Sequence, residues 1–225
     1  MGLFNILKGE QPVSTFISMV AHRESLDLGN TGEYLCAYAI ERSGLAERGR
    51  LYRNLIVPTG PRSRLETTEI DVVLLHPTGI YVIESKNYSG WIFGKADQRN
   101  WTVCLNRNTK ERVPNPIRQN NGHISALMRV LDLPREAFVS LIVFSERCEF
   151  KRIPDDTDST LIIHRNRMVK RIKEASGRRG VIFTPEKMED YRRALDSVST
   201  LSTADARARH VESLKASIGL KASIE

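Results

Sequence analysis

The chain has 225 residues, 40% hydrophobic and 27% charged, with a formal net charge of +7 and a pI near 9.5. This length can bury a sizeable core in one α/β domain with a helical appendage, and the composition is that of a soluble globular protein. The basic balance favours polyanionic partners without identifying one, and no stretch is long and apolar enough to span a membrane.

The cysteines, Cys36, Cys104 and Cys148, are odd in number, lack C-x-x-C spacing and stand among apolar neighbours. We therefore expect reduced, buried thiols rather than a zinc site or a disulfide scaffold. The apolar run at the start of the sequence is too short for a signal peptide, so the expected location is cytoplasmic.

Apolar residues at helical spacing predict a short helix over 12–23 and a second over about 31–42. Glu33 lies in the first turn of the second helix, where an acid is commonly a partner of the helix dipole. A first strand is expected over 51–57.

Residues 69–86 contain two β-branched apolar runs, 72–75 and 80–83, separated by a turn with Pro and Gly. Pairing the end of the first run with the start of the second places Asp71 opposite Glu84. Opposed carboxylates in such a pair repel each other, and Mg²⁺ relieves this because it binds one or two carboxylates and completes its shell with water. Lys86 shares the face of Glu84 through the strand period of two, and a plain Glu84–Lys86 ion pair is the structural alternative.

Two further strands are predicted over 91–93 and 101–105, and the polar stretch 106–112 is typical of a turn. The aromatic residues of these strands are expected to pack in the core or at a sheet edge, with stacking on nucleic-acid bases as the alternative. Asn115 and the following proline predict the start of a helix that runs to about Leu131. On that helix Gln119 and His123 lie one turn apart on one face.

The nearly continuous apolar run 138–144 predicts a buried strand that lies parallel to a neighbour after a crossover, and 161–163 a last short strand. A basic helix is expected over 165–175, where phosphate contact and a solvated face are about equally supported. A final helix begins after Thr184 and is expected to pack on the core up to Val198. A weaker helical pattern covers 205–218.

Asp71, followed on the next strand by Glu84-x-Lys86, resembles the core of the PD-(D/E)XK nuclease superfamily, and the surrounding sequence is similar to its nuclease-related domain family. The matching pieces are Gly32-Glu33, Glu69-Ile-Asp71, Gly79 to Gly90, Trp101 and Asn115 to His123. The proline of the superfamily name is absent, because Ile70 precedes Asp71.

This resemblance implies a restriction-endonuclease-like α/β core, with a central mixed β-sheet flanked by helices and a C-terminal helical extension. The implied division is an N-terminal helical segment over 1–28, a nuclease-related domain over 29–183 and the extension over 184–225. The extension is the candidate surface for a homo-oligomer or a protein partner, and its end is expected to be mobile or partner-binding.

The resemblance also assigns roles. The implied catalytic residues are Asp71, Glu84, Lys86, Glu33 and Gln119, and Mg²⁺ or Mn²⁺ is held by Asp71, Glu84, the backbone carbonyl of Ser85 and Glu33. Lys86 assists the attacking water. The candidate nucleic-acid contacts are Arg118, His123, Arg165, Arg167, Lys170, Arg171, Arg178 and Arg179.

The primary hypothesis is therefore a metal-dependent phosphodiesterase, an endonuclease that acts on DNA in preference to RNA, with no organic cofactor and no membrane partner. The alternative is a non-catalytic module that binds nucleic acid or a protein with the same fold, since folds persist after their chemistry is lost.

Overall fold

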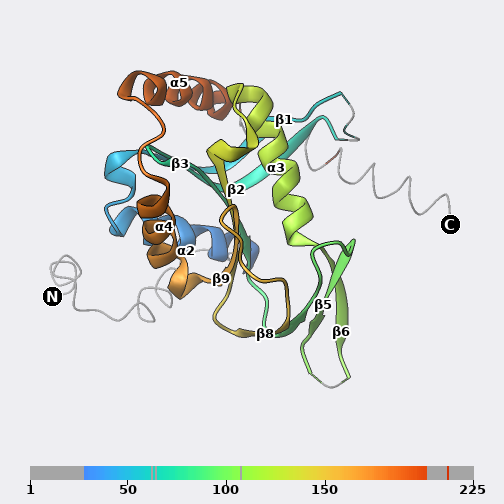
Figure 1. Cartoon of the computed structure of the whole chain (residues 1–225). Helices are drawn as coiled ribbons and strands as arrows, with labels where there is room; N and C mark the ends of the chain where they lie inside the picture. Colours follow the sequence, from blue (N-terminus) through green and yellow to red (C-terminus); the bar gives the residue numbers. More distant parts are fainter. Residues whose placement is uncertain (1–27, 62, 64, 107, 202–211, 213–225) are drawn as a thin grey trace, which may run out of the picture.

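The computed structural model describes residues 28–61, 63, 65–106, 108–201 and 212. Its centre is a five-stranded mixed sheet, sheet A, in the order β1-β2-β3-β7-β9 (Figure 1). The strands are β1 (Arg50–Pro58), β2 (Thr67–His76), β3 (Gly79–Lys86), β7 (Phe138–Phe144) and β9 (Thr160–His164). β1, β2 and β3 pair antiparallel, whereas β3, β7 and β9 are parallel, which confirms the predicted crossover into β7.

Helices cover both faces of sheet A (Figure 1). On one face, α2 (Leu28–Arg42) and α4 (Arg165–Arg179) pack on alternate residues of β2 and β3. On the other face, α3 (Pro116–Leu131) and α5 (Pro185–Leu201) pack on the intervening residues of the same strands. Both faces of the central strands are therefore buried, which explains their nearly unbroken apolar sequence. This arrangement confirms the predicted α/β architecture.

The predicted hairpin register is confirmed from Leu75–Ile80 to Val72–Ile83. The backbone ladder then stops on both sides of Asp71. Val72–Ile83 is the last pair toward β3, and on the β1 side the pairs pass from Arg53–Val72 to Leu55–Ile70 without an Asn54–Asp71 pair. Asp71 thus stands at an interruption in the sheet, and its side chain replaces a backbone partner, as described below.

A second, four-stranded sheet, sheet B, has the order β6-β5-β4-β8 and projects beyond one end of sheet A (Figure 1). Its strands are β4 (Gly90–Phe93), β5 (Asn100–Cys104), β6 (Lys110–Pro114) and β8 (Cys148–Arg152). The turn predicted over 106–112 is wrong for its last three residues, which begin β6, and β8 was not predicted. Both are edge strands with mostly exposed polar residues, so apolar alternation does not mark them.

Other expectations have mixed outcomes. All three cysteines are buried and free, as predicted. Val198 of α5 packs against the core, as predicted. Short 3₁₀ helices, η2 (Ala46–Arg48) and η3 (Arg135–Ala137), complete the described elements. The helices expected over 12–23 and 205–218 lie outside the described residues, apart from residue 212. In the described part of the chain, no helix combines the length and apolarity needed to cross a bilayer.

Candidate functional site

The candidate site lies where β2 and β3 diverge, at the carboxyl end of β3. Alternation places Asp71 on the side of Val73, and Glu84 on the side of Val82, which is the face covered by α3. Lys86 follows on the same face. The sequence therefore brings two acids and one ammonium to one side of the sheet, below the N-terminal half of α3.

Glu84 is buried, with 1% of its surface exposed, and both of its carboxylate oxygens are occupied. Oε1 lies 2.6 Å from Lys86 Nζ, and Oε2 lies 3.0 Å from His123 Nε2. Burial alone would raise the pKa of Glu84, but the hydrogen bond from His123 and the positive charge of Lys86 outweigh it, so the pKa is lowered. Glu84 is therefore an ionised carboxylate held from two sides.

The partners of Glu84 are held in turn. Lys86 Nζ also donates to Gln119 Oε1 at 3.0 Å, so α3 fixes the ammonium. His123 Nδ1 lies 2.9 Å from the Thr68 hydroxyl of β2. A proton on Nε2 is donated to the Glu84 carboxylate, while Nδ1 bonds the Thr68 hydroxyl, which can either donate or accept. For Lys86, desolvation lowers the pKa, but the negative charge of Glu84 overcomes it and the pKa is raised.

Asp71 has a different environment from Glu84. Its Oδ2 accepts a hydrogen bond from the Ser85 backbone N–H at 2.7 Å, in place of the missing strand ladder. Burial, followed by the charges of Glu84 and Glu33, raises the pKa of Asp71 to about 8. The pKa of Glu33 is raised to about 7 by burial, then by the charges of Glu69 and Glu84. Unlike Glu84, Asp71 and Glu33 are therefore not neutralised by the positive charges around them.

Helix α2 reaches the site because Gly32 allows it to lie directly on β3. A Cβ atom at Gly32 would lie 2.6 Å from Ser85 Oγ. The neighbouring Cys36 thiol lies 3.9 Å from the same hydroxyl. This close approach is what brings Glu33, the next residue after Gly32, within electrostatic range of Asp71.

Substitution of Gly32 by Leu is expected to separate α2 from β3, since the new side chain has no room beside Ser85. We expect a loss of about 1–3 kcal/mol in the free energy of unfolding. Gly177→Leu is the matched control, because Gly177 also lies in a helix but has no atom within 4 Å of its Cβ position. Urea unfolding of both variants checks this. Equal stability of the two would contradict the close contact.

The profile of the nuclease-related domain family matches residues 28–145, more than half of the 225-residue chain. The chain belongs to this family. An uncharacterised protein of Bacillus anthracis is 32% identical over 108 residues, which cover 48% of this chain and 50% of that protein. The chain thus spans about half the length of the curated relative it matches. No solved structure matches it.

The match confirms the family predicted from the sequence, and the mixed sheet flanked by helices confirms the restriction-endonuclease-like core. The matched range contains all of the acids and the lysine described above. The nuclease-related domain therefore gathers Asp71, Glu84, Lys86, Glu33 and Gln119 at one place, with His123 in contact with Glu84. Ser85 contributes its backbone N–H to this place, through Asp71.

The predicted basic contacts are not gathered in the same way. Lys86 of β3 pairs with Phe144 of β7, and Phe144 pairs with His164 of β9. Arg165 follows His164, so Arg165 lies at the site end of the sheet. Arg179, at the other end of α4, donates to the backbone carbonyl of Thr78, the turn residue before β3. Several of these side chains have acidic partners: Arg165 with Glu146, Lys170 with Glu174, and Arg171 with Asp156 and Glu174. The exposed ones are Arg118, Arg167, Lys170 and Arg178.

The structure adds Asn54 and Thr68, two residues that pattern analysis did not select. Asn54 lies in β1 beside Asp71 with a φ of 50°, a left-handed conformation in which asparagine is enriched. Its side chain hydrogen-bonds Glu33, which lowers the pKa of that acid against the larger effects of burial and neighbouring charge. Its Oδ1 is buried without a partner among the described residues. The local signal in the sequence was an asparagine in the middle of the predicted strand 51–57.

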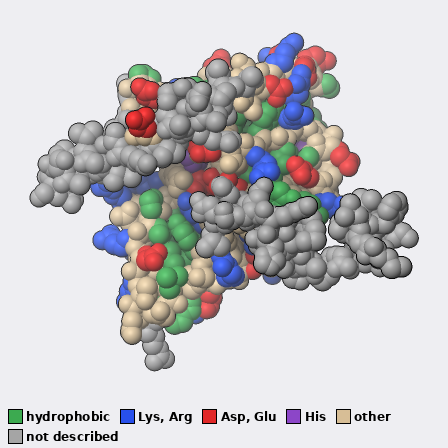
Figure 2. All heavy atoms as spheres, turned by 180° about the vertical axis from the view of Figure 1, so that it is seen from behind, with side chains coloured by type: hydrophobic (Ala, Val, Ile, Leu, Met, Phe, Trp, Pro, Cys, Tyr) green, Lys and Arg blue, Asp and Glu red, His purple; other side chains and the backbone are tan. Residues whose placement is uncertain are grey.

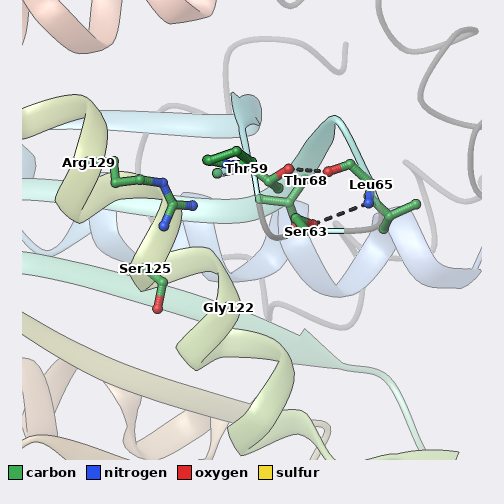
Figure 3. Close-up of a pocket in the computed structure, with 9 residues that line it drawn as sticks. Thr59, Ser63, Leu65, Thr68, Gly122, Ser125 and Arg129 are labelled. Carbon is green, nitrogen blue, oxygen red and sulfur yellow. Dashed lines mark hydrogen bonds between the residues drawn. The ribbon is translucent and has the colours of Figure 1, made fainter.

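A pocket of about 470 Å³ adjoins the site through Thr68. It lies between the β1–β2 connection and the outer side of α3 (Figure 3). Its described lining residues are Thr59, Gly60, Pro61, Ser63, Leu65, Thr68, Gly122, Ser125 and Arg129. Arg129 is the only charged one among these, and the others that carry polar side chains are hydroxyl residues. Because Thr68 also bonds His123, this pocket is two hydrogen bonds away from Glu84.

Proposed function

We propose that the chain is a metal-dependent nuclease that hydrolyses phosphodiester bonds, with DNA preferred over RNA. The observation that carries this proposal is the convergence of Asp71 and Glu84 at the end of β3, with Lys86 bonded directly to Glu84. Membership of the nuclease-related domain family supports the same chemistry. The basic net charge of +7 suits a polyanionic substrate.

The donor set suits Mg²⁺ or Mn²⁺. Asp71 has one carboxylate oxygen that makes no hydrogen bond to the described residues, and its pKa is raised first by burial and then by the negative charges of Glu84 and Glu33, which a cation would offset. Within the described ranges, no three His, Cys, Asp or Glu side chains form a ready metal cage. Mg²⁺ does not need one, because one or two carboxylates and several waters complete its shell. The proposed ligands are Asp71, Glu84, the Ser85 carbonyl and Glu33.

When bound, the metal would polarise the scissile phosphate and lower the pKa of a bound water. The protein side chains supply the remaining tasks. Lys86, which lies 2.6 Å from Glu84 Oε1 and is held by Gln119, is the group that would orient the attacking water. His123 holds Glu84 Oε2 throughout, so that one carboxylate oxygen has a fixed position. The unpartnered Oδ1 of Asn54 is an acceptor for a water in the same place.

Binding of the polymer would rest on the basic residues predicted for that purpose. Arg118 and Arg165 are the proposed contacts beside the scissile phosphate, because they lie at the site end of α3 and α4. The proposed outer contacts are Arg167, Lys170, Arg171, Arg178 and Arg179 along α4, whereas His123, which was predicted with them, bonds Glu84 and Thr68 and supports the site from within. The pocket lined by Arg129 is a proposed binding site for a neighbouring phosphate of the same strand.

Relaxation of supercoiled plasmid tests the proposal. The purified full chain is expected to convert plasmid to nicked and then linear forms with Mg²⁺ or Mn²⁺, and to leave it intact in EDTA. A linear RNA incubated in parallel compares the two polymers. Metal binding in calorimetry without cleavage of any DNA or RNA would contradict the proposal.

One observation favours a second candidate, a binding module without catalysis. Glu84 already has both oxygens satisfied by Lys86 and His123, so this acid is stable without a metal. Such a site would bind nucleic acid or a protein equally well in EDTA and in Mg²⁺. Cleavage that depends on the metal would exclude this candidate.

A further inference from the structure

One face of sheet B does not pack against the core. Paired residues lie on the same face of a sheet, so the register defines two rows across the four strands. The first row is Lys110, Cys104, Trp91 and Glu149, and the second is Arg112, Thr102, Phe93 and Arg152. The opposite face carries Ile92, Trp101 and Val103, which pack into the core. Each row of the outer face therefore joins an aromatic ring to a cation.

The outer face is accessible. Trp91 is 41% exposed, whereas Trp101 on the opposite face is 1% exposed. The prediction that these aromatic residues pack in the core or at a sheet edge is right for Trp101, whereas Trp91 lies exposed on an inner strand, because the two-residue strand period sends the two rings to different faces. Figure 2 shows hydrophobic side chains gathered on the lobe that sheet B forms, at the lower left, with basic side chains at its edges.

The outer face also has an excess of positive charge. Lys110, Arg112 and Arg152 are exposed and make no ion pair with the described residues. Lys151, at a bulge in β8, lies 5.3 Å from the centre of the Trp91 ring and pairs with Glu149, the one acid of the two rows. A groove of about 400 Å³ runs between the aromatic residues and Lys110. Aromatic rings beside unpaired cations suit a ligand with flat bases and phosphates.

We propose that the outer face of sheet B binds single-stranded nucleic acid, with bases stacked on Trp91 and Phe93 and phosphates held by Lys110, Arg112 and Arg152. Stacking requires exposed base faces, which a duplex does not offer, and four-stranded sheets bind single-stranded RNA in this way. The inference rests on the proposed nuclease function and specifies an unpaired strand as the substrate. β4 begins four residues after Lys86, so sheet B follows the candidate site directly along the chain.

Binding is measured in EDTA, which excludes cleavage, by anisotropy of a labelled oligothymidylate with the full chain. Trp91→Ala is expected to weaken binding about 5- to 100-fold, as loss of one stacked base does. Trp91→Phe retains a ring and is expected to keep most of the affinity. Leu105→Ala is the matched control, because Leu105 is 44% exposed on the same lobe but lies outside both rows; it is expected to bind as the wild type does.

Intrinsic fluorescence gives a second readout, since the chain has only two tryptophans. Oligothymidylate is expected to quench the wild type and not Trp91→Phe, in which only the buried Trp101 remains. Substitution of both Lys110 and Arg112 by Gln is expected to reduce the slope of log K against log salt by about 1.4, for two lost phosphate contacts.

Several results would overturn the inference. Unchanged affinity in Trp91→Ala would do so, as would equal binding of duplex with the same dependence on Trp91. A change from dimer to monomer in Trp91→Ala, with unchanged nucleic-acid binding, would identify the face as a protein interface. These outcomes are separate from the cleavage assays: absence of cleavage of plasmid, single-stranded DNA and RNA, with normal Trp91-dependent binding, rejects the nuclease and keeps this surface.

Discussion

Asp71→Asn and Glu84→Gln are each expected to abolish metal-dependent cleavage, and Lys86→Met is expected to lower it by about 10²–10⁴-fold, the usual contribution of a positioned proton-transfer group. The first two remove charge from the proposed metal ligands, so calorimetry with Mn²⁺ should show weakened binding. Lys86→Met should keep metal binding or strengthen it, because the ammonium competes for Glu84 Oε1 at 2.6 Å.

This separation distinguishes a catalytic lysine from a structural ion pair. Without metal, Lys86→Met leaves the buried Glu84 with His123 alone, and loss of one partner of a buried pair costs about 3–5 kcal/mol. Added Mn²⁺ is expected to restore stability, since it replaces the missing positive charge, but not activity. The matched control is Lys187→Met, an exposed lysine of α5, which should change stability by no more than about 0.5 kcal/mol. Wild-type cleavage by Lys86→Met would mean that Glu84–Lys86 is only an ion pair.

The metal-free protein is expected to lose stability as pH rises from about 4 to 8. Asp71 has an ordinary pKa of 3.8 and a folded pKa of about 8, and Glu33 passes from 4.5 to about 7. Between these values the folded state binds more protons than the unfolded state, so the free energy of unfolding falls with rising pH. Glu84 has a lowered pKa and acts in the opposite sense, but only as the pH falls through and below its ordinary value of 4.5.

Thermal unfolding in EDTA between pH 5 and 8 measures this effect, and each kcal/mol shifts Tm by about 2–4 °C for a domain of this size. Asp71→Asn should flatten the curve, because the amide does not titrate. Mn²⁺ should raise the wild-type Tm more at pH 8 than at pH 6, since protons compete with the metal for the acids. A wild-type Tm that rises between pH 5 and 8 in EDTA would show that folding does not raise the pKa values of Asp71 and Glu33.

The two acids were expected to tolerate each other only with a cation between them, and the structure offers a second solution. Lys86 and His123 bond the two oxygens of Glu84. Asp71 instead accepts a hydrogen bond from the Ser85 N–H and has a raised pKa. His123, a candidate nucleic-acid contact from the sequence, lies buried against Glu84 with 4% exposure. The metal is therefore a proposed replacement for Lys86 at one oxygen rather than a condition for folding.

The sequence by itself determined the hairpin register, the N-cap of α3 at Asn115 and the face shared by Asp71, Glu84 and Lys86. These follow from local rules, since alternation fixes which side of a strand a residue occupies and a cap satisfies its own helix. Resemblance to a family then added Glu33 and Gln119, which no local rule selects.

Only the tertiary structure decided which partners meet. His123 is 39 residues from Glu84 in the sequence. Asn54 lies in β1 and its partner Glu33 lies in α2. Neither contact can be predicted from sequence spacing. The same is true of β6 and β8, whose strands exist because β5 and β4 offer backbone partners, and of Trp91, which is exposed because the core covers only one face of sheet B. Local patterns fix the direction of a side chain, whereas its neighbour depends on how distant segments pack.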